Sequence, residues 1–295
     1  MGEQREEQAP GDLVEEPALD EDPADDAEDD HEDDLEDDLE DDLEDEEDEA
    51  YADAPPRRLV DRVRWTPVLL LQAAHTKQAL VTALAMGGVA ILTDRPAREV
   101  GVIALTVLVG QAILGWHNDI VDRERDAAHH ATGKPIADGR LDPGSAWYAI
   151  VVAALILVPL SITTGITAGG IYLVSVCIGM LGNVMLRTGF LSWVTWAASF
   201  AMLPAYLSYG GWGGQTVGDP PQTSITVLAA LLGIGVHFMR AVWGLVSDHE
   251  DGWTYLPLKL GLKLGATRLL ALATFYTVVI VVLLGVFGAR DGLTR

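Results

Sequence analysis

The chain has 295 residues and a formal net charge of −25, and that charge is very unevenly placed. Residues 1–56 hold 30 acidic residues and one basic residue, whereas the rest of the chain holds 14 acidic and 18 basic residues. This split excludes a simple acidic soluble globule and a basic nucleic-acid-binding stripe, and the single cysteine, Cys177, excludes both an internal disulfide framework and a cysteine metal cluster.

The acidic N-terminal segment is predicted to be a disordered tail. Residues 28–43 consist of a four-residue repeat, EDDH-EDDL-EDDL-EDDL, in which like charges repel and three leucines bury too little apolar surface to offset chain entropy. The alternative is an interaction arm for a basic partner, since the leucines recur at helical spacing. A signal peptide is not expected, because the N-terminal segment does not have a basic start followed by an apolar run. We expect a boundary at Pro55-Pro56, dividing a tail (1–56) from a membrane domain (57–295).

From Thr66 onward, long apolar runs alternate with short polar breaks. Seven runs approach the roughly 20 residues that one crossing of a bilayer needs. They cover residues 67–92, 100–117, 146–164, 167–186, 189–208, 225–247 and 266–288. The fold class expected from this pattern is all-α, a polytopic membrane helix bundle of about seven transmembrane helices.

The orientation of the bundle follows from its basic residues, which concentrate on the cytoplasmic side of membrane proteins. If the N-terminus is cytoplasmic, most of the basic residues between the apolar runs fall on that side. They are Arg57, Arg58, Arg62, Arg64, Arg123, Arg125, Lys134, Arg140, Arg187, Lys259 and Lys263. We therefore expect an integral protein of a bacterial-type cytoplasmic membrane, with the tail and both chemically rich loops in the cytoplasm.

The second apolar run ends in a group of oxygen-bearing side chains. These are Asn118, Asp119, Asp122 and Asp126. If the helix continues through them, the aspartates share one face, where several carboxylates repel one another unless a cation lies between them. Oxygen ligands suit Mg²⁺, which commonly bridges to substrate phosphates. The alternative is a solvated helix end in which Arg123 and Arg125 pair with the acids.

A second segment, KPIADGRL (134–141), follows that group and carries Lys134 and Arg140 around a turn shaped by proline and glycine. Both side chains are suited to phosphate oxygens. The order NDIVDRERD (118–126) and then KPIADGRL resembles the UbiA-type intramembrane prenyltransferase superfamily. The resemblance extends through GNVMLRTGFLSWVTW (182–196), where Arg187 takes the place of a basic residue before a turn, and covers about residues 60–275.

The resemblance implies a second aspartate motif after the sixth apolar run. Asp248 occupies its last aspartate position, counting back from Gly252, but Gly244 stands where the preceding aspartate is expected. Asp248, Glu250 and Asp251 then form a compressed version of the motif, and the alternative is a hydrophilic turn. The family also usually has nine spans, so we expect a bundle open on one side, or closed by a partner or a second copy.

Ionisable residues within the apolar runs point to a polar cavity, because such groups are costly in a bilayer. Lys77 lies in the first run and Arg240 lies about 10 Å inside the end of the sixth, at 1.5 Å per residue. His75, His237 and Asn183 are further cavity candidates. Snorkelling of Arg240 to the interface, or histidines satisfied between helices, are the structural alternatives.

Taken together, the resemblance implies Mg²⁺-dependent transfer of a prenyl group from a polyprenyl diphosphate to an aromatic or other small acceptor in the membrane. The alternatives are transfer of another group, such as phosphoribosyl, onto a lipid phosphate, or a non-catalytic protein that binds lipid diphosphates. The implied catalytic residues are Asp119, Asp122, Asp126 and Asp248. The implied metal ligands are Asn118, Asp119, Asp122 and Asp126 for one Mg²⁺, with Asp248 and Asp251 for a second. The implied diphosphate-binding residues are Lys134, Arg140, Arg187, Lys77 and Arg240.

Overall fold

A computed structural model describes residues 65–211 and 218–291 of the chain, and within those ranges it contains helices and no strands. The predicted tail and its boundary at Pro55-Pro56 lie outside the described residues. The longer helices are α3 (Thr76–Leu92), α4 (Ala97–Ala128), α5 (Pro143–Ile162), α6 (Ile166–Val184), α9 (Thr223–Ala241) and α12 (Ala266–Asp291). The shorter ones are α2 (Thr66–Ala73), α7 (Ser192–Ala201), α8 (Leu203–Ser208), η3 (Val242–Gly244), α10 (Leu245–Glu250) and α11 (Leu256–Leu264). The all-α prediction is confirmed.

Within residues 65–211 and 218–291, five helical segments are long and apolar enough to cross a membrane, and the chain is an integral membrane protein. They are Ala97–Ala128, Pro143–Ile162, Ile166–Val184, Thr223–Glu250 and Ala266–Arg290. The other two predicted runs form broken helices. The first is interrupted at His75, between α2 and α3, where the backbone takes a left-handed conformation with φ 52°. The fifth divides into α7 and α8, with Pro204 in the first turn of α8.

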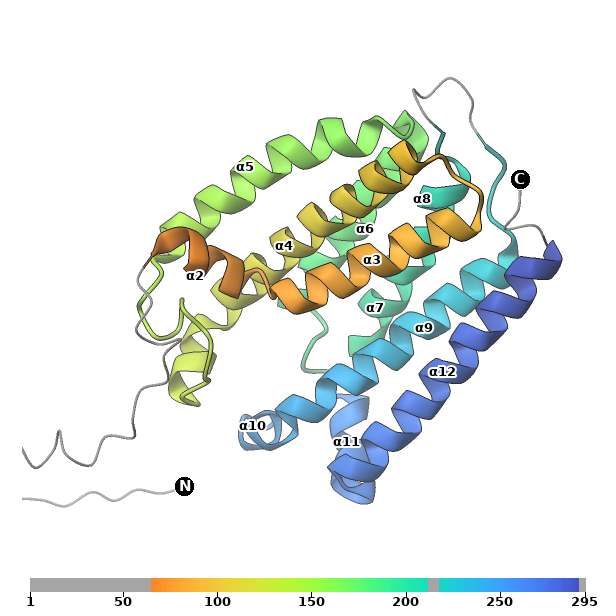
Figure 1. The fold of residues 1–295 in the computed structure, drawn as a ribbon. Helices are drawn as coiled ribbons and strands as arrows, with labels where there is room; N and C mark the ends of the chain where they lie inside the picture. Colours follow the sequence, from red (N-terminus) through yellow and green to blue (C-terminus); the bar gives the residue numbers. More distant parts are fainter. Residues whose placement is uncertain (1–64, 212–217, 292–295) are drawn as a thin grey trace, which may run out of the picture. The chain divides into compact units, whose positions relative to one another are not determined.

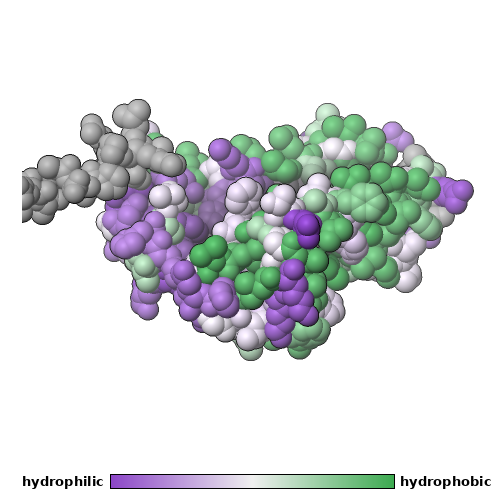
Figure 2. All heavy atoms as spheres, turned by 90° about the horizontal axis from the view of Figure 1, so that it is seen from below, coloured by the Kyte–Doolittle hydropathy of each residue, from purple (hydrophilic) through white to green (hydrophobic). Residues whose placement is uncertain are grey.

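Helix α4 is the centre of one group of helices and packs against α3, α5 and α6 (Figure 1). Helix α9 packs between α7 and α12, and α7 in turn contacts α6. Apolar side chains such as Leu84, Leu155 and Phe275 remain exposed, as expected for surfaces that meet lipid rather than water. On the face drawn in Figure 2, apolar residues cover much of the surface and hydrophilic residues gather toward one end.

A close approach between α4 and the break in the first run places His75 near Asp119. A Cβ atom at Gly115 would lie 2.7 Å from the backbone carbonyl of Ala74, so only glycine fits this contact without a shift. The neighbouring Trp116 donates a hydrogen bond of 2.7 Å from Nε1 to the Leu70 carbonyl. These contacts bring His75, the residue at the break, beside the next turn of α4.

Candidate active site

The first acidic segment (118–126) is helical in the structure, because α4 continues through it to Ala128. Asp119, Asp122 and Asp126 therefore lie on successive turns of one helix, as their spacing predicts. Asp119 is 2 % exposed and Asp122 is 9 % exposed, so these carboxylates face the protein interior. Asn118 donates a hydrogen bond of 2.6 Å from Nδ2 to Asp122 Oδ2. Buried carboxylates need charged or hydrogen-bonding partners, and each of these has one.

Lys134 is the main partner of Asp119. Its Nζ lies 2.6 Å from Asp119 Oδ1 and 3.3 Å from Asp126 Oδ2. His75 Nε2 also lies 2.8 Å from Asp119 Oδ1. Burial acts to lower the pKa of the Lys134 ammonium, but the carboxylates of Asp119 and Asp126 outweigh it, so the pKa of Lys134 is raised. Lys134 is thus a fixed cation beside the α4 carboxylates.

Two carboxylate oxygens in this group are buried and accept no hydrogen bond from the described residues. They are Asp119 Oδ2 and Asp126 Oδ2, of which Asp126 Oδ2 keeps the 3.3 Å ion pair with Lys134. An orphaned carboxylate oxygen is costly to bury, and it is also the kind of ligand that a hard divalent cation takes. Across residues 65–211 and 218–291, no three His, Cys, Asp or Glu side chains converge as a ready metal cluster. Basic side chains stand among the carboxylates instead.

Arg187 is the partner of Asp122. Its Nη1 donates to Asp122 Oδ1, across a separation of 65 residues in the sequence. Arg187 follows α6 in a turn where Leu186 has φ 64°, a left-handed conformation that reverses the chain before α7. Asn183, on α6, donates to the Leu114 carbonyl at 3.3 Å and contacts His117 Nδ1 at 3.2 Å. The α6–α7 junction is therefore tied to α4 at the level of the carboxylates.

The second acidic loop meets α4 through Arg125. The Arg125 guanidinium donates to Asp248, to Asp251 and, at 3.0 Å, to Ser247 Oγ. The other oxygen of the Asp248 carboxylate accepts a hydrogen bond from the Tyr255 hydroxyl. Hydrogen bonds from Arg125 and His129 lower the pKa of the Asp251 carboxyl below its ordinary value. Both acidic segments therefore belong to one polar region, although more than 120 residues separate them.

Trp253 connects the two halves of this region. The Arg125 guanidinium carbon lies 4.4 Å from the centroid of the Trp253 ring, and that of Arg187 lies 5.2 Å from it. The indole ring thus contacts both Arg187, which pairs with Asp122, and Arg125, which pairs with Asp248 and Asp251. Such cation–π contacts contribute about 0.5–2 kcal/mol each.

Arg140 and Lys77, two of the predicted diphosphate-binding residues, lie outside α4. Arg140 donates hydrogen bonds to Asp138 on its own loop, from Nε and Nη2 to Oδ2 at 2.8 and 2.6 Å. It also lines an open pocket that includes Gly133 and the Asp126 side of the site. Lys77, at the start of α3, is exposed and makes no polar contact with another described residue. Their roles as phosphate ligands stay predictions.

Arg240 bridges α9 to α3. Its Nη1 donates to Gln78 Oε1, and its guanidinium carbon lies 5.8 Å from the centroid of the Trp196 ring. One turn earlier on α9, His237 is buried and its Nε2 lies 2.9 Å from Ser192 Oγ. The histidine is thus satisfied between helices, the structural alternative considered for it. A role for Arg240 in diphosphate binding stays a prediction.

Trp253 and Tyr255 have no role in the sequence-based predictions, and Arg125 appears there only as a partner of nearby acids. A signal for Arg125 was present, because it lies three residues after Asp122 and therefore near the same face of α4. Both aromatic residues lie in the GWTYLP segment that follows the second acidic loop. Their contacts cross between distant segments, so spacing alone could not reveal them.

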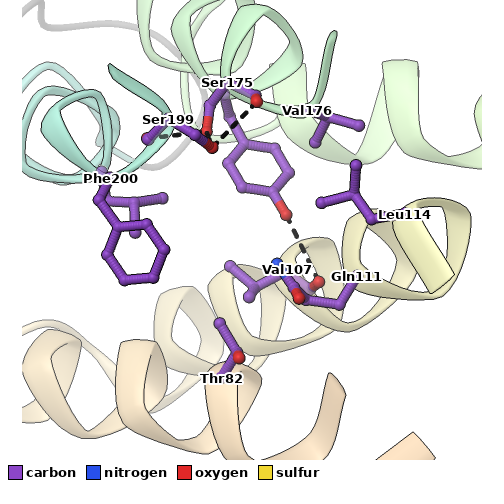
Figure 3. Close-up of a pocket in the computed structure, with 10 residues that line it drawn as sticks. Thr82, Val107, Gln111, Leu114, Ser175, Val176, Ser199 and Phe200 are labelled. Atoms are coloured by element: carbon purple, nitrogen blue, oxygen red, sulfur yellow. Dashed lines mark hydrogen bonds between the residues drawn. The ribbon is translucent and has the colours of Figure 1, made fainter. Parts of the chain in front are cut away.

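A small cavity lies deeper in the bundle, between α3, α4, α6 and α7 (Figure 3). The Ser175 and Ser199 hydroxyls lie 2.9 Å apart on its wall, and Gln111 and Thr82 also line it. Its volume of about 30 Å³ suits one or two water molecules. Gln111 precedes Asp119 by eight residues, or about 12 Å of helix. This cavity is therefore separate from the carboxylates and too small for a prenyl group.

Fold and site together define a polytopic helical membrane protein with a charged, two-part site at one end of its helices. The family model of the UbiA prenyltransferase family matches residues 79–293, and the chain belongs to that family.

Comparison with solved structures gives the same fold. The chain is similar to a UbiA homolog from Archaeoglobus fulgidus bound to GPP and Mg²⁺, with a TM-score of 0.57 and 15 % identity over 73 % of this chain and 76 % of that one. It is also similar to a UbiA homolog from the same organism bound to DMAPP and Mg²⁺, with a TM-score of 0.55 and 14 % identity over 72 % and 75 % of the two chains. No curated protein sequence matches the chain.

Proposed function

We propose that the protein transfers a prenyl group from a polyprenyl diphosphate to an aromatic or other small acceptor within the membrane, and that it needs Mg²⁺ to do so. The observation that carries the proposal is the group of buried α4 carboxylates, held by Lys134 and Arg187 at the end of an apolar bundle. Membership of the prenyltransferase family supports it. The ligands of the two similar structures, a prenyl diphosphate with Mg²⁺, support it as well.

The metal is assigned to the α4 face. The residues that would hold it are Asn118, Asp119, Asp122 and Asp126. They fit a hard cation because Asp119 Oδ2 is buried without a hydrogen-bond partner among the described residues. Bound there, Mg²⁺ supplies positive charge that neutralises the diphosphate leaving group.

The basic residues bind the same leaving group. Lys134 and Arg187 already lie against the carboxylates, so a diphosphate brought to this face would meet both of them. Arg140, Lys77 and Arg240 are assigned supporting contacts with the diphosphate. Donors fixed in advance around a developing negative charge lower the barrier to its formation.

The transfer itself follows from this arrangement. The bond between the allylic carbon of the donor and the diphosphate oxygen breaks, and its electron pair leaves with the diphosphate. A carbon or heteroatom of the acceptor then bonds to the allylic carbon, and the acceptor loses one proton. The apolar interior of the bundle excludes water, which would otherwise capture the allylic cation.

The topology is part of the proposal. We assign residues 1–56 to a tail, and we place the N-terminus and both acidic segments on the cytoplasmic side. The contact between Arg125 and Asp251 supports a common side for the two segments. Labelling a cysteine introduced into the 129–133 turn of a Cys177→Ser variant, from one side of sealed vesicles, tests the assignment. Labelling only from the extracellular side would refute it.

Mass spectrometry of membrane lipids tests the function. Lipids are compared between cells that express the wild type and cells that express an Asp119→Asn, Asp122→Asn double variant at equal level. We expect a prenylated compound that is present only with the wild type, and its mass names donor and acceptor together. Identical lipid profiles from the two strains would refute prenyl transfer.

A further inference from the structure

We propose that the Arg125 guanidinium takes the place of a second metal ion, so that the donor is bound with one Mg²⁺ per chain. The inference rests on the proposed function and specifies its cation requirement. It departs from the sequence-based expectation that Asp248 and Asp251 hold a second ion.

Both oxygens of the Asp248 carboxylate already accept a hydrogen bond from another side chain. Arg125 donates to its Oδ1 and the Tyr255 hydroxyl donates to its Oδ2. The residue is 4 % exposed, so both contacts are made away from solvent. A metal ion would have to share this carboxylate with a guanidinium that already neutralises it.

Arg125 is held in place from several directions. Its Nε donates to Asp251, its Nη2 also reaches Ser247 Oγ at 3.0 Å, and its guanidinium lies over the Trp253 ring at 4.4 Å. A planar guanidinium that is stacked and hydrogen-bonded in this way is fixed in advance, unlike a mobile surface arginine. It carries a permanent positive charge between the two acidic segments.

The space around Gly244 also favours a fixed Asp248 carboxylate. The family pattern places an aspartate there, yet a Cβ atom at Gly244 would lie 2.8 Å from Asp248 Oδ2 and 3.2 Å from Asp248 Cγ. Any side chain would therefore push against a carboxylate that Arg125 and Tyr255 hold in place. With glycine at this position, the second segment offers one carboxylate fewer, and the Arg125 cation already neutralises Asp248 and Asp251.

The experiment counts metal ions in the complex with a donor analogue. The full-length protein in detergent is incubated with Mn²⁺ and geranyl S-thiolodiphosphate, in which the bond to the leaving group breaks slowly. A rapid desalting step removes Mn²⁺ held weakly by the acidic tail, and the retained Mn²⁺ and analogue are then quantified. We expect one Mn²⁺ for each bound analogue in the wild type.

Variants separate a cation role from a structural one. Arg125→Ala frees Asp248 and Asp251, so we expect two Mn²⁺ per analogue and a turnover that depends on Mg²⁺ with second-order rather than first-order character. Arg123→Ala, at an exposed arginine that pairs with Glu124, should retain one ion. A merely structural arginine would change stability without changing the ion count.

The outcomes distinguish the inference from the function on which it rests. Two Mn²⁺ per analogue in the wild type would overturn the inference while leaving prenyl transfer intact. One Mn²⁺ in both the wild type and a folded Arg125→Ala variant would also overturn it. Failure of the wild type to retain the analogue at any Mn²⁺ concentration would overturn the proposed function as well. If Arg125→Ala does not fold, the wild-type count decides.

Discussion

The Nζ atom of Lys134 lies 2.6 Å from the Oδ1 atom of Asp119, and this contact joins the turn after α4 to a buried carboxylate on the helix itself. The lysine is 23 % exposed at its side chain, whereas the aspartate is almost completely covered. Lys134 is thus reachable from solvent, whereas Asp119 is not. Under the proposed function, a metal-bound diphosphate would enter beside this pair, where the loop would supply positive charge for the anion and the helix would supply oxygens for the metal.

Replacing Lys134 by methionine should weaken donor binding and also lower the melting temperature, because buried Asp119 then keeps only His75 beside it among the described residues. The loss of a charge-assisted contact costs about 2–3 kcal/mol, or on the order of 100-fold in KM for the prenyl diphosphate. Steady-state kinetics with varied donor measures the change. The control is Lys263→Met, at an exposed lysine of α11, which should leave KM within a factor of two. Equal KM values for the two variants would remove Lys134 from the donor site.

Gly115 should be intolerant of a side chain, because a Cβ atom there meets the Ala74 carbonyl group at 2.7 Å. Gly115→Ala forces α4 away from the break at His75 and should destabilise the protein by about 1–3 kcal/mol. Thermal unfolding in detergent measures the loss. Gly101→Ala, earlier on α4 with no atom within 4 Å of the added Cβ, should be neutral or slightly stabilising. A melting temperature that falls equally in both variants would contradict the packing argument.

Trp253 should matter for turnover although it carries no charge. Trp253→Leu removes the ring that contacts Arg125 and Arg187, so both cations lose a support worth about 0.5–2 kcal/mol each. We expect turnover to fall about tenfold, with little change in melting temperature. Trp243→Leu is the matched control, since Trp243 is 85 % exposed. A loss of activity that is as large for Trp243→Leu would show a general effect of removing tryptophan.

The fold class and the α4 face were predictable because they depend on local periodicity. Apolar runs predict helices, and the spacing of Asp119, Asp122 and Asp126 places them together whenever the helix continues. The partners of these residues were less predictable, because the contacts of Arg187 and Trp253 connect turns that are distant in sequence. The breaks at His75 and between α7 and α8 were also missed, since an apolar run reads as continuous even where the backbone turns.

The tail should be dispensable for the fold. Deleting residues 1–56 removes a net charge of −29 and leaves every described helix in the chain. We expect an unchanged melting temperature and unchanged turnover at saturating Mg²⁺. At low Mg²⁺ and low ionic strength, the shortened chain should need less Mg²⁺, because the acidic tail no longer competes for the ion. An unchanged Mg²⁺ requirement under all conditions would limit the tail to a solubilising role.

Transfer of a radiolabelled prenyl group tests whether the α4 carboxylates drive Mg²⁺-dependent prenyl transfer. Purified protein in lipid nanodiscs is supplied with labelled geranyl diphosphate, a membrane lipid extract as the source of acceptor, and Mg²⁺. We predict labelled lipid from the wild type and from Asp94→Asn, a control before α4, and a loss of about 1,000-fold or more when Asp119→Asn and Asp122→Asn are combined. Equal labelling by that double variant and the wild type would show that the α4 carboxylates do not drive the transfer.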